Sequence, residues 1–228
     1  RLSEEREMPR IKLLDRQKLI NIACNEYWLN GIDNVPIASI AKIADISRPG
    51  IYIEFKNEDN LQLEALKHYT HFFDINVIKN YDDYKKYPNN LHLHLNLLIN
   101  DNNNKPIGKH ICAEFNDAIK RPLGAKGCLF RNSVVIKNKL GPLTQQFINN
   151  FEKYRINQFS KYIIGMQNDR KFKKYLNVSD SAKYINMQFS VAQVMKNSGS
   201  KKLDIKKYIN VAFKPLLEES FIDKFKFK

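Results

Sequence analysis

The stretch of sequence that decides the fold runs from position 40 to position 52: Ile40-Ala41-Lys42-Ile43-Ala44-Asp45-Ile46-Ser47-Arg48-Pro49-Gly50-Ile51-Tyr52. Its first half places apolar residues at helical spacing, and Ser47 is a residue type that caps the start of a helix. Two helices separated by so short a turn have the spacing of a helix-turn-helix motif. The second helix of such a motif lies in the major groove of DNA, with its N-terminal residues toward the base edges.

Helical patterns continue on both sides of this stretch. Gly31 stands where a helix C-terminus favours a left-handed residue, and Pro36 is a good first residue for the next helix. We therefore expect an all-α protein. Its helices are predicted at 11–30, 36–44, 47–55, 57–78, 106–120, 127–139, 142–167, 180–196 and 203–220.

One region, residues 79–105, departs from the helical pattern. It is rich in Tyr, Asp, Lys and Asn, and it contains Leu91-His92-Leu93-His94-Leu95, which alternates with period two. Alternation indicates a strand. A lone strand in a helical protein has nothing to pair with, so a short helix or an ordered flap is an equal alternative.

The composition is that of a folded and basic protein. The chain has 228 residues, of which 43% are hydrophobic and 11% aromatic, enough for a sizeable core. Its net charge of +14 indicates an acidic partner such as nucleic acid. Residues 1–56, however, hold nine Lys and Arg against eight Asp and Glu, so the excess lies mostly outside the predicted DNA-binding segment.

The cysteines and the apolar runs indicate a compartment. Three Cys without paired spacing are interpreted as reduced thiols. No apolar run is long enough for a membrane span. We therefore expect a cytoplasmic protein with no membrane contact.

The helix after Ser47 carries the residues that we expect to contact DNA. Arg48 can donate two hydrogen bonds to a guanine, and Gly50 lets the backbone approach closely. Tyr52 and Lys56 can reach phosphates, which position the protein without reading sequence. For Arg48, Tyr52 and Lys56 taken one at a time, a place on the solvated surface without DNA contact is an equal interpretation. The full predicted set is Lys42, Ser47, Arg48, Pro49, Gly50, Tyr52 and Lys56.

Residues 11–61 resemble the DNA-binding domain of TetR-type bacterial transcriptional regulators. The stretch from Ile40 to Tyr52, with Phe55-Lys56-Asn57 and Leu61, is similar to the family pattern I-A-x-x-A-G-V-S-x-x-x-(L/F)-Y-x-x-F-x-(S/N)-K-x-x-L. Gly127-Cys128-Leu129-Phe130-x-Asn132 is similar to the G-C-L-x-x-N that begins the sixth helix in many members. Residues 180–218 resemble the two C-terminal helices that form the dimer's four-helix bundle.

The resemblance implies two domains. A helix-turn-helix DNA-binding domain would occupy 10–56, and a helical ligand-binding and dimerisation domain 57–228, with 79–104 as an insertion. In this family a ligand cavity forms between the helices of the second domain. The residues that we expect to line this cavity are Cys112, Phe115, Asn116, Arg131, Phe147, Phe151, Tyr154 and Gln158. The alternative for each of them is an ordinary place in the core.

Several positions depart from the family pattern. Asp45 stands where the turn usually has Gly, although Asp is among the residues that best tolerate a left-handed backbone. Glu58 stands where the family usually has a Lys that contacts phosphate, and a carboxylate there repels DNA. Ala38 replaces a common Arg. These departures bear on DNA affinity more than on the fold.

Other chemistries lack their motifs. The sequence has no Gly-rich phosphate loop, no G-x-S-x-G and no H-E-x-x-H, so we predict no enzyme, no catalytic residue and no cofactor. His68 and His71 lie three residues apart without an evident third ligand, so no metal site is predicted. Cys128 is interpreted as a packing thiol, while Cys112 is an alternative candidate for redox sensing.

These observations support one function and leave one alternative. We expect a homodimer, formed through residues 180–220, that binds a palindromic double-stranded DNA operator as a repressor. A small-molecule effector in the C-terminal domain would release it. The alternative is a TetR-like fold that serves protein interaction or acts as a DNA scaffold, with weak or no operator specificity.

Overall fold

The computed structural model describes residues 15–76, 78, 81, 83–86, 88–99 and 122–227, and these residues are helical almost throughout. The α-helices are α1 (Arg16–Asn30), α2 (Ile37–Ala44), α3 (Arg48–Phe55), α4 (Glu58–Asn76), α5 (Asn89–Ile99), α6 (Leu129–Val135), α7 (Pro142–Asn168), α8 (Val178–Asn197), α9 (Lys202–Phe213) and α10 (Glu219–Ile222). Extended pairing within these residues is limited to an isolated bridge between Phe172 and Leu217. The predicted all-α class is confirmed.

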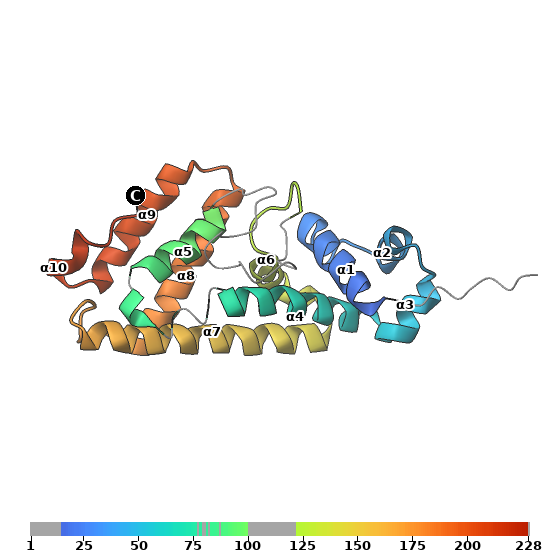
Figure 1. Ribbon diagram of the computed structural model, residues 1–228, viewed down its shortest axis with the longest axis horizontal. Coiled ribbons are helices and arrows are strands. Elements are labelled where there is room, and N and C mark those ends of the chain that lie inside the picture. Colours follow the sequence, from blue (N-terminus) through green and yellow to red (C-terminus); the bar gives the residue numbers. More distant parts are fainter. Residues whose placement is uncertain are drawn as a thin grey trace, which may run out of the picture.

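The first three helices gather at one end of the molecule, and α8 to α10 lie at the other (Figure 1). Arg16 of α1 holds the N-terminal group together. Its guanidinium forms ion pairs with Glu54 of α3 at 2.9 Å and Glu64 of α4 at 3.0 Å, and it stacks over the ring of Phe55. One arginine therefore joins three helices, and two carboxylates balance its charge.

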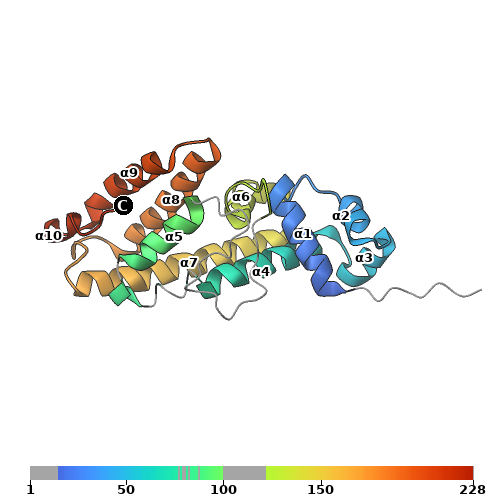
Figure 2. The ribbon, with the colours of Figure 1, turned by 45° about the horizontal axis from the view of Figure 1, so that its top comes forward.

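Helices α4 and α7 run side by side along the length of the molecule (Figures 1 and 2). Asp59, in the first turn of α4, caps the start of α7. Its two carboxylate oxygens accept hydrogen bonds from the backbone N–H groups of Leu143 at 2.9 Å and Thr144 at 3.0 Å. The Thr144 hydroxyl donates back to the Asp59 carbonyl at 3.1 Å. This carboxylate satisfies two helix N–H groups that otherwise lack a partner.

Gly141, the residue before α7, makes this contact possible. A Cβ atom at position 141 would lie 2.2 Å from the Asp59 Cγ. The side chain of Asp59 therefore fills the space that any other residue at position 141 would need.

The region with alternating leucines is a helix, so the strand alternative for residues 91–95 is wrong. Helix α5 buries Leu91, His94, Leu95 and Leu98, a spacing of three and four residues. The ring of His94 stacks on Phe189 of α8 with centroids 4.1 Å apart. The predicted domain boundary and the insertion at 79–104 stay predictions, since one apolar core runs from α1 to the C-terminal residues.

The C-terminal part is a helical pair with an aromatic tail. Gly199, with φ of +86°, follows the end of α8 and allows the turn into α9. Helix α9 ends at Phe213 rather than at the predicted 220, because Pro215 cannot continue it. Phe225 and Phe227 then pack against each other at 5.3 Å, near His92 of α5.

We predict that Asp59→Ala lowers the free energy of unfolding by about 1–2 kcal/mol, because two N–H groups of α7 lose their cap. Urea denaturation of the purified protein measures this loss. Asp204→Ala is the control, since Asp204 is an exposed carboxylate in the first turn of α9. We expect it to cost about 0.5 kcal/mol. Equal losses in the two variants would contradict a specific role for the Asp59 cap.

Candidate functional site

The first candidate site is the outer surface of α3. Ser47 caps this helix as predicted, because its Oγ accepts a hydrogen bond from the Gly50 N–H at 3.2 Å. Ile51 and Phe55 are buried in the core, which turns Arg48 and Pro49 to the solvent. The geometry therefore presents the start of α3 outward.

The turn before α3 and the end of α3 both rely on left-handed residues. Asp45 has φ of +54° at the end of α2, as expected for an Asp in place of Gly. Lys56 has φ of +66°, and its N–H donates to the Tyr52 carbonyl at 2.8 Å. The left-handed backbone at Lys56 ends the helix after two turns, and the Lys56 side chain is exposed.

The structure places all seven predicted DNA-binding residues on α2, α3 or their flanking residues. Six are exposed and Gly50 is half-buried. Tyr52 has 41% of its surface exposed and Ile53 has 83%. Ile53 was not among the predicted DNA-binding residues, yet its exposure makes it available to the methyl group of a thymine.

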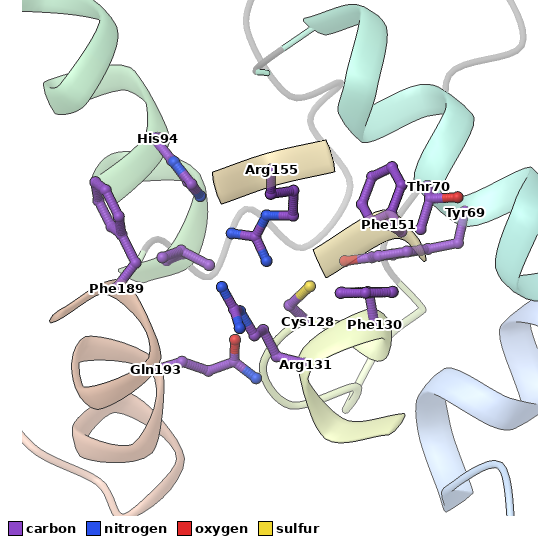
Figure 3. Close-up of a pocket in the computed structure, with 11 residues that line it drawn as sticks. Tyr69, Thr70, His94, Cys128, Phe130, Arg131, Phe151, Arg155, Phe189 and Gln193 are labelled. Carbon is purple, nitrogen blue, oxygen red and sulfur yellow. The ribbon is translucent and has the colours of Figure 1, made fainter. Parts of the chain in front are cut away.

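The second candidate site is a pocket among five helices of the larger part of the chain (Figure 3). Its volume is small, because only about 10 Å³ is open to the centre of a water molecule. That space holds about one water. The lining residues are Tyr69, Thr70, His94, Leu98, Cys128, Phe130, Arg131, Phe151, Arg155, Phe189 and Gln193.

Two buried arginines give the pocket its electrostatic character. Arg131 of α6 and Arg155 of α7 have exposed fractions of 9% and 3%, and their guanidinium groups point toward each other in Figure 3. Both contact the same oxygen, Glu152 Oε1, at 3.1 Å from Arg131 Nη1 and 3.5 Å from Arg155 Nη1. Arg131 also donates a short hydrogen bond to Asn186. Burial lowers the pKa of both guanidinium groups, and the repulsion of Arg155 lowers the pKa of Arg131 further.

Some polar atoms around the pocket lack hydrogen-bond partners. Among the described residues, these atoms include Arg155 Nε and Gln193 Oε1, both buried. His94 is bonded to the Tyr81 hydroxyl through Nδ1 at 2.7 Å. Burial, with Arg155 and Arg131 nearby, lowers the pKa of His94 well below its usual value, so this imidazole is neutral at neutral pH.

The motif from Gly127 to Asn132 builds one wall of the pocket. Gly127 has φ of +68°, and a Cβ atom there would lie 2.7 Å from the amide of Gln193. The amide of Gln193 in turn donates to Asn132 Oδ1 at 3.0 Å. Cys128 is buried, as predicted, and lines the pocket. The motif therefore fixes the loop before α6 against α8.

The predicted ligand-binding residues fall into three groups. Arg131 and Phe151 line the pocket. Phe147, Tyr154 and Gln158 do not: Phe147 stacks on Phe151, the Tyr154 hydroxyl donates to Asp74 at 2.6 Å, and Gln158 is buried elsewhere on α7. Cys112, Phe115 and Asn116 lie outside the described residues.

Sequence reasoning missed most of the lining. It did not propose Arg155, although this arginine lies four residues from both Phe151 and Phe159 and so interrupts a helical apolar stripe. A charged residue at such a position indicates a buried charge. The lining residues from α4, α5 and α8 had no comparable indication. His94 in particular was not proposed as a pocket residue.

The pocket is connected to the helix-turn-helix end by two routes. Helix α4 starts three residues after α3 and supplies Tyr69 and Thr70 to the pocket. The indole N–H of Trp28 in α1 donates to the Gly127 carbonyl at 3.0 Å, and the ring packs edge-on against Tyr69 at 4.9 Å. A movement of α6 would therefore reach α1 directly.

Searches of the described residues for other site types gave no candidate. They contain no group of three His, Cys, Asp or Glu placed to hold a metal ion. None of their helices is both long and apolar enough to span a lipid bilayer.

Comparison with known proteins identifies the fold. No protein-family model matches the chain, and no curated protein matches it significantly. Among solved structures, Escherichia coli NemR in its reduced form superimposes with a TM-score of 0.66 at 11% identity, covering 89% of this chain and 97% of NemR. A protein from Saccharomonospora viridis, assigned as a transcriptional regulator and crystallised with choline, gives 0.65 at 16% identity, covering 90% and 98%.

A TetR-family transcriptional regulator from Cytophaga hutchinsonii gives a TM-score of 0.62 at 14% identity, covering 93% of this chain and 95% of the other. These similarities extend over nearly the whole of both chains in each pair. They include the N-terminal helix-turn-helix as well as the larger helical part. The chain therefore has the fold of the TetR family of transcriptional regulators.

Proposed function

We propose that the protein is a dimeric, sequence-specific DNA-binding regulator, and that it is a repressor released by a small molecule bound in the pocket. One observation carries the proposal: the Ser47-capped helix α3 presents Arg48, Tyr52 and Ile53 to solvent at the outer end of the molecule. In a helix-turn-helix protein this is the arrangement that enters the major groove.

The proposed mechanism is a shift between two dimer conformations. In the DNA-competent dimer, the two α3 helices must lie about 34–36 Å apart, one turn of the double helix. A ligand in the pocket contacts α4, α6 and α7 together, and α4 leads directly to α3. A ligand that binds one conformation more tightly shifts the population toward it, by no more than the difference between its two affinities.

An exposed apolar stripe on α8 and α9 supports the proposed dimer. Tyr184, Met187 and Val194 lie on α8 at helical spacing, and Leu203 and Val211 lie on α9. Four of these five side chains are at least 60% exposed, the exception being Tyr184 at 36%. A second copy of the chain, packed through the same stripe, would bury them in a symmetric interface.

The alternative, a protein-interaction or scaffold role, is favoured by the charges near α3. Glu58 is exposed at the start of α4, directly after the DNA-binding helices, and Arg16 is already paired with two carboxylates. Titration against DNA from the region upstream of the protein's own gene, at two salt concentrations, separates the two functions. Tight, salt-sensitive and sequence-selective binding supports the regulator. Weak binding without sequence preference supports the alternative.

We predict that Arg48→Ala costs about 1–3 kcal/mol of binding free energy at one base pair in each half-site, because the base loses a bidentate donor. Competition binding with operators altered at single positions measures the change in preference. If wild type and variant had the same affinity for the specific site, Arg48 would have no role in base recognition.

Glu58→Lys is expected to tighten binding to all DNA sequences by a similar factor, because it replaces a repulsive carboxylate with a phosphate partner. The same titration, made with specific and random DNA, checks the prediction. A steeper dependence on salt should accompany the gain. A loss of affinity would show that the Glu58 carboxylate has another part in the complex.

Val194→Glu is expected to shift the protein toward monomer and to weaken operator binding, because two carboxylates would then meet in the apolar interface. Analytical ultracentrifugation measures the association. Val135→Glu is the matched control, since Val135 is 82% exposed on α6 and lies off the stripe. Equal association of both variants would contradict the proposed interface.

A further inference from the structure

The pocket holds more positive than negative charge. Arg131 and Arg155 face each other across it, and within the described part of the chain Glu152 is the carboxylate that reaches both. His94 adds no charge, because it is neutral when buried. The described charged groups at the pocket thus sum to +1.

An excess buried cation is unfavourable unless an anion accompanies it, because the guanidinium has lost its hydration. Arg155 is the more isolated of the two arginines. It is 3% exposed, its Nε has no hydrogen-bond partner among the described residues, and its contact with Glu152 is the longer one. Its side chain points into the pocket in Figure 3.

We propose that the pocket binds an organic anion whose oxyanion group, a carboxylate or a phosphate, lies between Arg131 and Arg155. This inference rests on the proposed function, since it names the chemical class of the effector. Guanidinium groups present planar pairs of donors that match the two oxygens of a carboxylate or phosphate. The bound anion would neutralise the excess charge of the site.

The rest of the lining fits the apolar body of such a ligand. Phe130, Phe151 and Phe189 supply aromatic surface, and Leu98 supplies aliphatic surface. Beside Arg131, as Figure 3 shows, Gln193 has its amide N–H engaged by Asn132, while its Oε1 has no partner among the described residues. This oxygen suits a hydroxyl or N–H donor on the ligand. An amphipathic acid therefore matches the pocket better than a bare inorganic anion does.

The size of the pocket implies that the ligand must open it. The space holds about one water, so even a single aromatic ring has to displace side chains. Because Arg131 belongs to α6 and Arg155 to α7, an anion held between them adds a contact across these two helices. The anion therefore supplies the differential affinity that a conformational switch requires.

The test is isothermal titration calorimetry, with thermal unfolding, on the full-length protein without DNA. The probes are benzoate, phenyl phosphate, the neutral benzamide and the cation choline. We expect one of the two anions to bind with a dissociation constant at least about tenfold below that of benzamide, and to raise Tm with concentration. The tighter of the two anions identifies the oxyanion group. The proposal would be overturned if benzamide bound as tightly as the anions, if choline raised Tm, or if neither anion bound.

Arg155→Met keeps the length of the side chain and removes the excess charge. We expect anion binding to weaken at least about tenfold, while Tm without ligand stays the same or rises. Lys153→Met is the matched control, because Lys153 is exposed on the same helix and its loss changes the net charge equally. A sharp fall of Tm in Arg155→Met, with anion binding unchanged, would make Arg155 a structural ion-pair partner and refute the proposal.

These measurements are independent of operator binding. If the anion binds as expected while DNA does not, the regulator function fails and the ligand class stands. If selective DNA binding is found but no anion binds, the ligand class fails and the regulator function stands.

Discussion

The cap that Asp59 places on α7 is the contact on which the arrangement of the two ends of the molecule depends. Asp59 lies at the start of α4, four residues after Phe55 ends α3, and α7 carries one wall of the pocket. The carboxylate holds the N-terminus of α7 through two hydrogen bonds, and Gly141 leaves room for it. The N-terminus of α7 is therefore tied to the first turn of α4, which begins three residues after the end of α3.

The interior of the larger part combines close packing with an unusual number of polar groups. Arg131, Arg155 and Glu152 form a charged cluster between aromatic rings, where a desolvated charge is expensive. A purely structural interior would be more stable with apolar side chains at these positions. The cluster therefore stands apart from the core around α1 to α3, whose stability comes from apolar burial and from Arg16 at the surface.

The sequence predicted the helix-turn-helix closely, because each part of it depends on local chemistry. Ser47 caps, Asp45 takes a left-handed backbone, and Pro49 stands in the first turn, all within one short stretch. The pocket could not be predicted in the same way, because it is made by residues from five helices that are distant in the sequence. Residues 91–95 show the same limit. Leu91 and Leu95 fit both the two-residue period of a strand and the 3.6-residue period of a helix, and it is the tertiary packing that stabilises the helix. Arg155 was not predicted either, although its place in an apolar stripe of the sequence is a signal that could have identified it.

The hydrogen bond between Trp28 and Gly127 has a consequence for optical measurements. Trp28 is the single tryptophan of the chain, and its indole is buried between α1, the loop before α6 and Tyr69. The tryptophan fluorescence of the protein therefore arises from the joint between the N-terminal helices and the pocket, with no contribution from another indole. A separation of that joint exposes the ring to water and moves its emission to longer wavelength. The unlabelled protein thus carries its own reporter of the coupling between its two ends.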